Sequence, residues 1–574
     1  MNDVSIDRTT TAANERCVHM VCKYTPIELF AGFGAECRVL EDMAHDFDAS
    51  HTITHANLCG FGKAAIQGAL EGDVDELVLV NCCDVMRRSY EVIADTQSCS
   101  FLHLMDLPHS CGPCQVEALA RQLKNLKDRY QRTSGITFDL AACLAAFATP
   151  EHENGPYVAL LGARVSSELH QMVQERFSIP VRNLTCTGLR NVQVEDDMLA
   201  TTDEDAFFQA YAKALLAQVP CRRMVDPTGR RALFQDPNLK GVVYHTMKFC
   251  DFYEPEYAEA KAACAAPILK IETDYTRQSA GQLVTRIEAF AETLRLSSNS
   301  ATETAAPVTS KSNAPHYAAG IDSGSTSTDV VVLDRAGNIA AWAIIPTGGG
   351  ARKSADACLD QALEQAGIAR SDLGATITTG YGRAYIGEGS NNSITEISCH
   401  AKGARYLDPQ VRTIIDIGGQ DNKVIKIDAS GNVADFAMND KCAAGTGRFL
   451  EMMASALQIP LSEMSTMGLT WDEDITISSM CSVFAESEVV SLVAQSKSVP
   501  DIVHGLDDSV ASKVVGLAKR VGGEPPYMMT GGVAQNAGVV AALERKLGCN
   551  VAVHEHAQLC GALGAALFAL EQIS

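Results

Sequence analysis

Two segments of this chain repeat one pattern, and the repeat constrains the fold more than any other feature of its 574 residues. They read AGIDSGSTSTDVVVLDRAGNI (residues 319–339) and IIDIGGQDNKVIKIDASGNV (residues 414–433). Four matches share one offset: Asp322 with Asp416, Gly324 with Gly418, Asp334 with Asp428, and Gly337-Asn338 with Gly431-Asn432. Each copy predicts a strand, a glycine-rich turn, a second strand and an Asx-Gly turn, which together form a hairpin with a flexible tip. Against the alternative of two unrelated hairpins, the repeat favours a duplicated domain whose two tips face one ligand.

The residue types in these tips suit a nucleotide. Glycines let backbone N–H groups approach phosphate oxygens, and an aspartate in each tip suits Mg²⁺, which takes oxygen ligands. A third glycine-rich stretch, MMTGGVAQNAGVVAALERKL (residues 528–547), predicts a strand, a turn and a helix that approach the same ligand. The candidate nucleotide-binding residues of the three loops are Asp322, Gly324, Ser325, Thr326, Ser327, Asp416, Gly418, Gly419, Gly531, Gly532 and Gln535.

A stretch of small and polar residues divides the chain. Residues 297–316, SSNSATETAAPVTSKSNAPH, contain almost no large apolar side chains, so they predict a flexible linker. Before it, short apolar runs alternate with helix-like stretches, as in parallel α/β domains. We therefore expect an α/β protein with Rossmann-like parallel-sheet lobes in residues 1–296 and the duplicated domain in residues 317–574.

Composition limits the partners and the compartment. The net charge of −23 argues against a nucleic-acid partner, because phosphate contacts need Lys and Arg. No apolar run approaches the ~18 residues of a membrane span, and the polar start lacks the apolar core of a signal peptide. We expect a cytoplasmic protein without membrane association. Its 20 cysteines then indicate metal binding, redox chemistry or burial rather than disulfides.

The C-terminal half resembles the actin/hexokinase/Hsp70 ATPase superfamily and, within it, the ATP-dependent activators of 2-hydroxyacyl-CoA dehydratases and the ATPase subunits of benzoyl-CoA reductases. The resemblance runs from about Tyr317 to the C-terminus. It rests on GIDSGSTSTD, TTGYGR, EISCHAKGA, DIGGQDNKVIKID, NDKCAAGTGRFLE and MTGGVAQNAGV. It implies a duplicated RNase H-like, actin-like domain that binds ATP and Mg²⁺. Gln420 and Asp421 in the second tip are the candidates to orient the hydrolytic water or Mg²⁺.

Two residues depart from the pattern of the wider superfamily. Asp329 and Asn422 stand where many of its members carry Lys and Ser or Thr. Neither departure affects a cysteine. A carboxylate at position 329 cannot neutralise phosphate charge as a lysine would, so the neutralising group has to be found elsewhere.

Two cysteines of this half stand before apolar-periodic helices. A helix N-terminus favours a thiolate, so Cys442 and Cys481 suit an anionic cluster, although position alone equally allows buried structural cysteines. The resemblance implies that one cysteine from each motif binds a [4Fe–4S] cluster. Two thiolates per chain cannot supply four ligands, so one cluster would be shared across a homodimer. Cys399 and His400 are assigned to packing.

The N-terminal half resembles the smaller, cluster-binding component of the 2-hydroxyacyl-CoA dehydratase and benzoyl-CoA reductase family. The resemblance rests on YTPIELFAGFGAE, NLCGFGKAA, NCCDVMRRSYEVI, MDLPH, MKFCDFYEPE and KIETDYTRQSAGQLVTRIEAF. It implies a [4Fe–4S] cluster held by Cys59, one of Cys82 and Cys83, and Cys250. Eight other cysteines are interpreted as core or surface thiols: Cys17, Cys22, Cys37, Cys99, Cys143, Cys186, Cys221 and Cys264.

The stretch SCGPCQVEALARQL (residues 110–123) allows three interpretations. Cys111 and Cys114 before a helix are typical of a thioredoxin dithiol, but the stretch lies within a larger α/β domain and no Trp precedes it. The alternatives are an incidental pair or additional cluster ligands. With the four candidates above they make six thiolates, which suit the double-cubane cluster known in a branch of this family.

The whole chain is therefore interpreted as a fusion of an iron–sulfur acceptor with its ATP-hydrolysing activator. We expect ferredoxin or flavodoxin to reduce the shared cluster, and ATP turnover to drive one low-potential electron to the N-terminal cluster. Two alternatives are an activase or maturation ATPase whose N-terminal half only docks a separate dehydratase, and a small-molecule kinase. The sequence identifies neither the substrate nor whether a further subunit is required.

Overall fold

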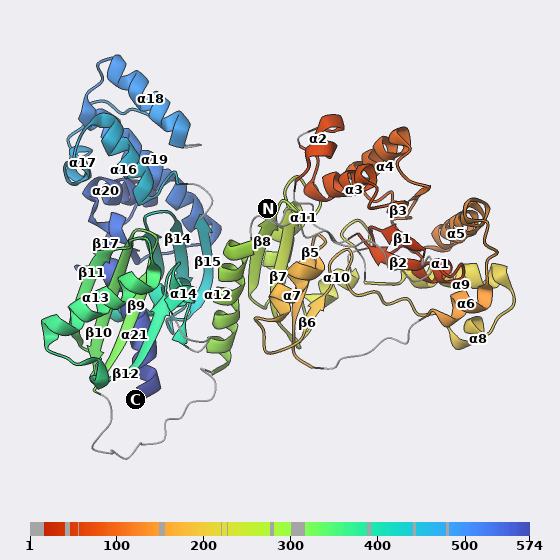
Figure 1. Ribbon diagram of the computed structural model, residues 1–574, viewed down its shortest axis with the longest axis horizontal. Coiled ribbons are helices and arrows are strands. Elements are labelled where there is room, and N and C mark those ends of the chain that lie inside the picture. The colour runs from red at the N-terminus through yellow and green to blue at the C-terminus, as the bar shows by residue number, and fades with distance from the viewer. Residues whose placement is uncertain are drawn as a thin grey trace, which may run out of the picture. The chain divides into compact units, whose positions relative to one another are not determined.

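The computed structural model describes residues 16–40, 46–55, 57–147, 155–219, 221–226, 228–275, 280–299, 316–386, 392–439, 443–477 and 482–573 (Figure 1). The chain forms two compact units, Met1–Ile287 and Glu288–Ser574. In the ranges just given, no helix is long and apolar enough to cross a membrane.

The first unit contains two four-stranded parallel sheets. The first has the order β2 (Glu36–Val39), β1 (Cys17–Met20), β3 (Glu76–Val80), β4 (Phe101–Met105). The second has the order β6 (Val181–Asn183), β5 (Tyr157–Gly162), β7 (Leu239–Met247), β8 (Ile268–Thr273). The expectation of parallel-sheet α/β lobes is confirmed.

Helices connect these strands: α1 (Ile27–Ala31), α2 (Asp48–Ile53), α3 (Gly60–Glu71), α4 (Asp84–Thr96), α5 (Pro113–Ser134), α6 (Leu140–Ala145), α7 (Ser167–Gln174), α8 (Asp196–Leu199), α9 (Glu204–Leu216), α10 (Thr228–Leu233) and α11 (Tyr253–Ala263). The apolar runs ELVLV of β3 and YVALLG of β5 are buried almost throughout, as strands covered on both faces require. Because all strands of a sheet run in one direction, the loops after them gather at one edge, where ligand sites of such folds form.

The second unit contains two sheets with one pairing scheme. The first has the order β11 (Ile339–Pro346), β10 (Ser327–Asp334), β9 (Tyr317–Ser323), β12 (Leu373–Thr379). The second has the order β15 (Val433–Asn439), β14 (Asn422–Ile427), β13 (Thr413–Ile417), β16 (Tyr527–Thr530), β17 (Val551–Val553). In both, two antiparallel pairings precede a parallel one. The register also matches, since Asp329 lies opposite Asp322 and Lys423 lies opposite Asp416.

The helical elements of this unit are α12 (Ala280–Asn299), α13 (Ala351–Ala366), η2 (Arg370–Asp372), α14 (Arg383–Ile386), α15 (Glu396–Leu407), α16 (Gly447–Leu457), α17 (Leu461–Met467), α18 (Ser482–Ala494), α19 (Val499–Arg520), η4 (Gly532–Gln535), α20 (Ala537–Leu547), η5 (Ala557–Leu559) and α21 (Cys560–Ile573). Helices α15 and α21 cross with their backbones in close contact. A Cβ added to Gly564 would lie 1.8 Å from the Cys399 carbonyl oxygen, and one added to Gly403 would lie 2.1 Å from that of Cys560. The crossing therefore requires glycine on both helices.

The division between the units falls inside α12, before the linker expected from composition. Glu288 pairs with Arg383 at 2.7 Å, and Glu292 accepts hydrogen bonds from the backbone N–H of Thr395 and the hydroxyl of Ser398. These contacts tie the second part of α12 to the second unit. The helix continues to Asn299, so the first residues of the expected linker are helical, and residues 300–315 lie outside the described ranges.

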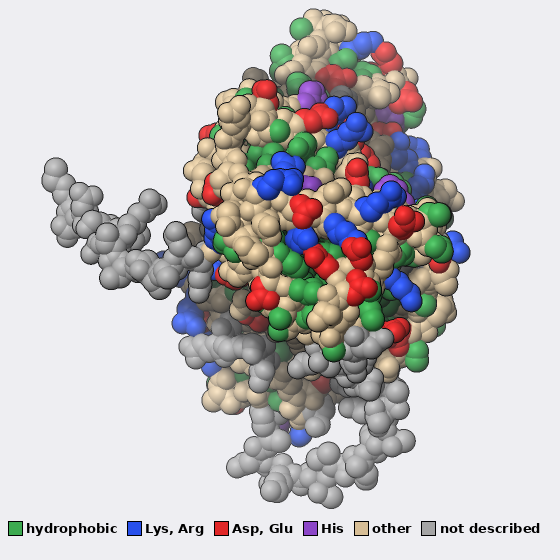
Figure 2. All heavy atoms as spheres, turned by 90° about the vertical axis from the view of Figure 1, so that its right-hand side faces the viewer, with side chains coloured by type: hydrophobic (Ala, Val, Ile, Leu, Met, Phe, Trp, Pro, Cys, Tyr) green, Lys and Arg blue, Asp and Glu red, His purple; other side chains and the backbone are tan. Residues whose placement is uncertain are grey.

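Charged side chains of both signs are interspersed on the face shown in Figure 2. Lys and Arg side chains lie among Asp and Glu side chains there rather than forming one basic patch. Ion pairs on the surface of the first unit, such as Arg88 with Glu91 and Lys124 with Asp205, are of this mixed kind. Such exposed pairs contribute little to stability, ~0–1 kcal/mol each.

Candidate functional site

The two repeated hairpins end in the same turn. The Gly324 N–H donates to the Ser327 carbonyl at 2.9 Å, and the Gly418 N–H donates to the Asp421 carbonyl at 3.0 Å. Each turn leaves the residues of its tip at the surface, where backbone N–H groups and hydroxyls are available to a ligand.

The tips touch one another. A Cβ added to Gly419 would lie 1.9 Å from Thr326 Oγ1, so the second tip lies directly against the Thr326 side chain of the first. Ser325, Thr326 and Gln420 are exposed beside this contact. The geometry agrees with two tips that face a common ligand.

The third glycine-rich loop abuts the second hairpin. Gly531 follows β16 with φ +82°, and a Cβ there would lie 2.5 Å from the Ile417 carbonyl oxygen. Thr530, at the end of β16, donates its hydroxyl to Asp416 Oδ1 at 3.0 Å. Gln535 donates to Gln558 Oε1 at 2.8 Å, so its side chain is held within the loop region.

His400 lies between the two repeated aspartates. Its Nε2 is 3.9 Å from Asp322 Oδ2, and its Nδ1 is 3.6 Å from Asp416 Oδ1. Burial raises the pKa of Asp322 to about 6, while His400 opposes that rise. The assignment of His400 to packing therefore missed its position. A signal existed, because Glu396 and His400 are four residues apart in EISCHAKGA and share one helix face.

Lys423 neutralises the acidic side chains around the second tip. Its Nζ is 3.0 Å from Asp421 Oδ2, 3.2 Å from Asp416 Oδ2 and 3.3 Å from Glu396 Oε2. Burial opposes the charge of Lys423, but the three carboxylates outweigh it and hold its pKa well above the usual value. Burial likewise works to raise the pKa of Asp416, and His400 and Lys423 outweigh it and hold that pKa low. Sequence reasoning singled out neither Lys423 nor Glu396.

The two departures from the superfamily pattern have different surroundings. Asn422 is buried and donates its side-chain amide to the Gly445 carbonyl at 2.9 Å, which ties the second hairpin to the loop before α16. Asp329 is also buried, and burial together with the nearby Asp322 raises its pKa to about 8.

A further buried carboxyl, Asp507 of α19, lies behind the third loop. Cβ atoms added to Gly538 and Gly468 would lie 2.1 Å and 2.3 Å from its Oδ2. Both of its oxygens are buried without a hydrogen-bond partner among the described residues. Burial raises the pKa of Asp507 to about 8, and Arg545 opposes the rise only in part.

This carboxyl predicts a pH-dependent stability. The folded chain keeps a proton on Asp507 that the unfolded chain loses above its ordinary pKa of 3.8, so the contribution is complete below that value and is lost as the pH rises toward about 8. Asp507→Asn is therefore expected to gain stability over the native chain with rising pH, by at most ~1.4 kcal/mol per pH unit. Urea unfolding at low and neutral pH measures the gap. Asp508→Asn, at a surface carboxylate paired with Arg545, is the control, and a gap that does not change with pH contradicts the assignment.

The helices that follow the two candidate cluster cysteines of this unit are described, but Cys442 and Cys481 lie outside the described residues. Helix α16 begins five residues after Cys442, and its first turn is bonded to the second tip. The Gly447 N–H donates to the Gly418 carbonyl at 2.9 Å, and the Arg448 N–H donates to the Gly419 carbonyl at 2.8 Å. The second tip and the first turn of α16 are therefore joined by backbone hydrogen bonds.

In the first unit, three cysteines stand at helix N-termini. Cys83 is the N-cap of α4 and accepts the Met86 N–H at 3.3 Å. Cys59 is the N-cap of α3, and Cys250 lies just before α11. Burial raises the pKa of both Cys59 and Cys250, and backbone N–H groups of the helix that follows each one oppose that rise. Helix N-termini favour anionic thiolates, and here three of them face one region.

These three thiols interact with one another and with an arginine. Cys83 and Cys250 both act to raise the pKa of Cys59, which places the sulfurs within electrostatic range. A hydrogen bond from Cys82 lowers the pKa of Cys83 to about 6, and Arg223 adds to this effect. The Arg223 guanidinium stacks on Phe252 at 3.9 Å. Sequence reasoning missed Arg223.

The other candidate pair is placed differently. Cys111 and Cys114 are exposed at the start of α5, and Cys111 Sγ donates to the Leu216 carbonyl at 3.1 Å. Cys221 acts to raise the pKa of both Cys22 and Cys186, so these three thiols, interpreted from the sequence as core or surface thiols, lie near one another. The described part of the chain holds no group of three or more His, Cys, Asp or Glu side chains that could hold a metal ion. A cluster is ligated through separate irons, so its thiols stand farther apart than the ligands of a single ion.

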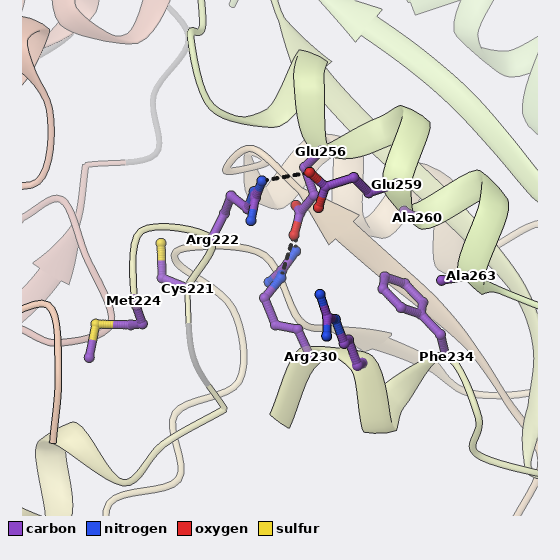
Figure 3. A pocket seen from close by; sticks show the side chains of 10 residues that line it. Cys221, Arg222, Met224, Arg230, Phe234, Glu256, Glu259, Ala260 and Ala263 are labelled. Atoms are coloured by element: carbon purple, nitrogen blue, oxygen red, sulfur yellow. Dashed lines mark hydrogen bonds and ion pairs between the residues drawn. The ribbon is translucent and has the colours of Figure 1, made fainter. Parts of the chain in front are cut away.

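A cavity of about 190 Å³ lies beside Cys221 (Figure 3). Two ion pairs form its walls: Arg230 with Glu256 at 2.6 Å and Arg222 with Glu259 at 2.9 Å. The Tyr244 hydroxyl also donates to Glu256. The charges of Arg230 and Glu256 are buried and mutually neutralised, so they stabilise the shape of the wall.

Comparison with known proteins matches the two halves of the chain to two different families. Residues 319–569 match the family model described as the BadF/BadG/BcrA/BcrD ATPase family. The 2-hydroxyisocaproyl-CoA dehydratase activator of Clostridioides difficile is 43% identical over 256 residues, which are 45% of this chain and 96% of that protein. The chain belongs to the BadF/BadG/BcrA/BcrD ATPase family. Residues 22–155 and 142–294 match the model described as 2-hydroxyglutaryl-CoA dehydratase, D-component, so the family resemblance of both halves, and with it the fusion, is confirmed.

Two more proteins are similar to part of the chain. The (R)-2-hydroxyglutaryl-CoA dehydratase activating ATPase of Acidaminococcus fermentans is 44% identical over 256 residues, covering 45% of this chain and 98% of that protein. The solved structure of the 2-hydroxyisocaproyl-CoA dehydratase activator from Clostridium difficile with bound ADPNP is 42% identical. It covers 45% of this chain and 95% of its own, with a TM-score of 0.43.

Proposed function

We propose that the chain is an ATP-dependent electron-transfer enzyme in which the second unit hydrolyses ATP and delivers a low-potential electron to an iron–sulfur cluster in the first. The observation that carries the proposal is the pair of hydrogen bonds from the first turn of α16 to the second tip. These bonds connect the second tip, which would bind the nucleotide, to the helix that follows Cys442.

The nucleotide would lie across the three glycine-rich loops of an actin-like, RNase H-like domain. Gly324, Gly418 and Gly419 would let the phosphates approach the backbone of the two tips, and the hydroxyls of Ser325 and Thr326 would donate to them. Asp322 and Asp416 would hold the Mg²⁺ that accompanies ATP, and Gly531 and Gly532 would contact the nucleoside. The named relative with bound ADPNP supports ATP as the nucleotide.

Gln420 and Asp421 would orient the attacking water in this site. Gln420→Ala is expected to lower ATP hydrolysis ~100-fold while nucleotide affinity changes only a few-fold, because the side chain acts on the water and not on the phosphates. The measurement is steady-state phosphate release together with ADP binding. Gln410→Ala, at a residue just before β13, is the control. Equal losses of hydrolysis and affinity would contradict the role.

A homodimer would share one [4Fe–4S] cluster through Cys442 and Cys481 of each chain. Helix α18, which follows Cys481, exposes a row of apolar side chains that such a contact would cover: Val483, Phe484, Val490 and Val493 are 49–68% exposed. Large exposed apolar side chains of this kind mark contact surfaces. Ferredoxin or flavodoxin would supply the electron, and ATP would drive its transfer through a change in α16.

The acceptor would be a cluster on Cys59, Cys83 and Cys250. The three thiols suit it because helix N-termini and Arg223 stabilise negative charge around them. The cluster would supply electrons for reductive activation of a 2-hydroxyacyl-CoA or for reduction of another small molecule, alone or with a separate dehydratase or reductase subunit. Cys111 and Cys114, or the group around Cys221, would add ligands if the cofactor is a double cubane.

Iron and sulfide content of the anaerobically purified chain tests the proposal. A shared cluster plus a [4Fe–4S] acceptor gives about six irons per chain, and a double cubane gives about ten. About two irons would overturn the acceptor role and leave an activase that docks a separate dehydratase. No iron with intact ATP turnover would indicate a small-molecule kinase. Replacing Cys111 and Cys114 with serine then shows whether the pair holds iron.

A further inference from the structure

The hairpins of the two sheets differ at one equivalent buried position. In the second sheet Lys423 lies opposite Asp416, and in the first sheet Asp329 lies opposite Asp322. The same place in the same register thus carries a cation in one hairpin and a second carboxylate in the other.

Asp322 and Asp329 share one face of their sheet. Residues directly opposite on antiparallel strands point to the same side, with Cβ atoms ~4.5–5.5 Å apart. Val331 and Leu333, which alternate with Asp329 on β10, pack against α21, and Asp322 lies against Gly561 near the start of that helix. The two carboxyl groups therefore lie together on the α21 side, at the end of the hairpin that carries the first tip.

The pair has less compensation than the second sheet: His400 lies 3.9 Å from Asp322, and no ion pair among the described residues reaches Asp329. Lys423 Nζ is within 3.3 Å of three carboxylates, whereas Asp329 Oδ1 is buried without a hydrogen-bond partner. Asp329 is 6% exposed, and its Oδ2 accepts only a long bond of 3.4 Å from the Ser327 hydroxyl among the bonds described. Like charges directly opposite on a sheet are destabilising, so a positive charge beside Asp329, where the described residues place none, would stabilise the pair.

We propose that Asp322 and Asp329 bind a second divalent cation, additional to the one that accompanies ATP, at the position that Lys423 occupies in the other hairpin. Carboxylate oxygens and nucleotide phosphates are the ligands that Mg²⁺ takes in proteins. The cation neutralises the phosphates at the first tip, where Ser325 and Thr326 are exposed. This inference rests on the proposed nucleotide site.

Counting bound Mn²⁺ tests the inference on the full-length chain. Equilibrium dialysis with saturating ADP is expected to give about two Mn²⁺ per native chain and about one for Asp329→Asn and for Asp329→Lys. Asp334→Asn, at the far end of the same strand, is the matched control and retains about two. Bound ADP in every variant shows that the fold and the nucleotide site are intact.

The dependence of ADP affinity on free Mg²⁺ separates the two replacements. Affinity of the native chain is expected to fall about tenfold as Mg²⁺ is withdrawn from the second site, because cation and nucleotide binding are coupled. Asp329→Lys supplies the charge covalently, so its ADP affinity is expected to change less than about twofold over the same range. One Mn²⁺ in all variants, or two in all, overturns the inference while ADP binding leaves the proposed function standing. A native chain that binds no ADP instead overturns the proposed function.

Discussion

Cys83→Ser is expected to remove about four irons from each chain, whereas Cys82→Ser leaves the iron content unchanged. The two cysteines are adjacent, but their surroundings differ. Cys83 caps α4, accepts a backbone N–H and has its pKa lowered to about 6, first by a hydrogen bond from Cys82. The pKa of Cys82 is raised by that hydrogen bond and by burial. The N-cap position and the accepted backbone N–H therefore favour Cys83 as the ligand.

Serine at position 82 keeps a hydroxyl that can donate the same hydrogen bond, which makes Cys82→Ser the matched control. Iron and acid-labile sulfide per chain, measured on anaerobically purified protein, decide the comparison. The EPR signal of the reduced N-terminal cluster adds a second readout and should disappear only in Cys83→Ser. Loss of iron from Cys82→Ser alone would reverse the assignment, and loss from neither would exclude both residues as ligands.

Lys423→Met is expected to lower the free energy of unfolding of the second unit by about 3–5 kcal/mol. The substitution leaves the buried Asp416 and the half-buried Asp421 and Glu396 without the ammonium group that contacts all three. Removing one partner of a buried ionic group costs far more than the group contributes, because the remaining charges stay desolvated. Methionine has a similar shape, so lost packing adds little.

Chemical denaturation followed by circular dichroism measures this effect. Lys426→Met is the control: it lies on the same strand, its Nζ donates to the Gly522 carbonyl near Glu524, and it is more exposed, so the loss should stay below ~1 kcal/mol. Adding Asp421→Asn to Lys423→Met should recover part of the stability, since one uncompensated charge is removed. Equal losses of unfolding free energy for Lys423→Met and Lys426→Met would show that the contacts of Lys423 stabilise the fold no more than those of the more exposed Lys426.

Local patterns were enough to predict the elements of this fold. The alternation of apolar runs with helical stretches predicted parallel α/β lobes, and the repeated hairpin motif predicted two tips that meet, because strand and turn signals lie within a few residues. The position of Thr326 against Gly419 agrees with that expectation. The sequence did not predict that α12 continues into the expected linker. Composition alone does not show the contacts that Glu288 and Glu292 make within the second unit.

Tertiary structure decided which residues complete the sites. The chain itself determined which groups are available: the repeated aspartates, the glycines of three loops and the cysteines before helices. Only the crossing of α15 with α21 puts His400 between Asp322 and Asp416, and only strand register sets Lys423 and Asp329 in equivalent places. Charge compensation and ligand geometry depend on distances between residues far apart in the chain. Such distances are fixed by packing, which a local pattern does not contain.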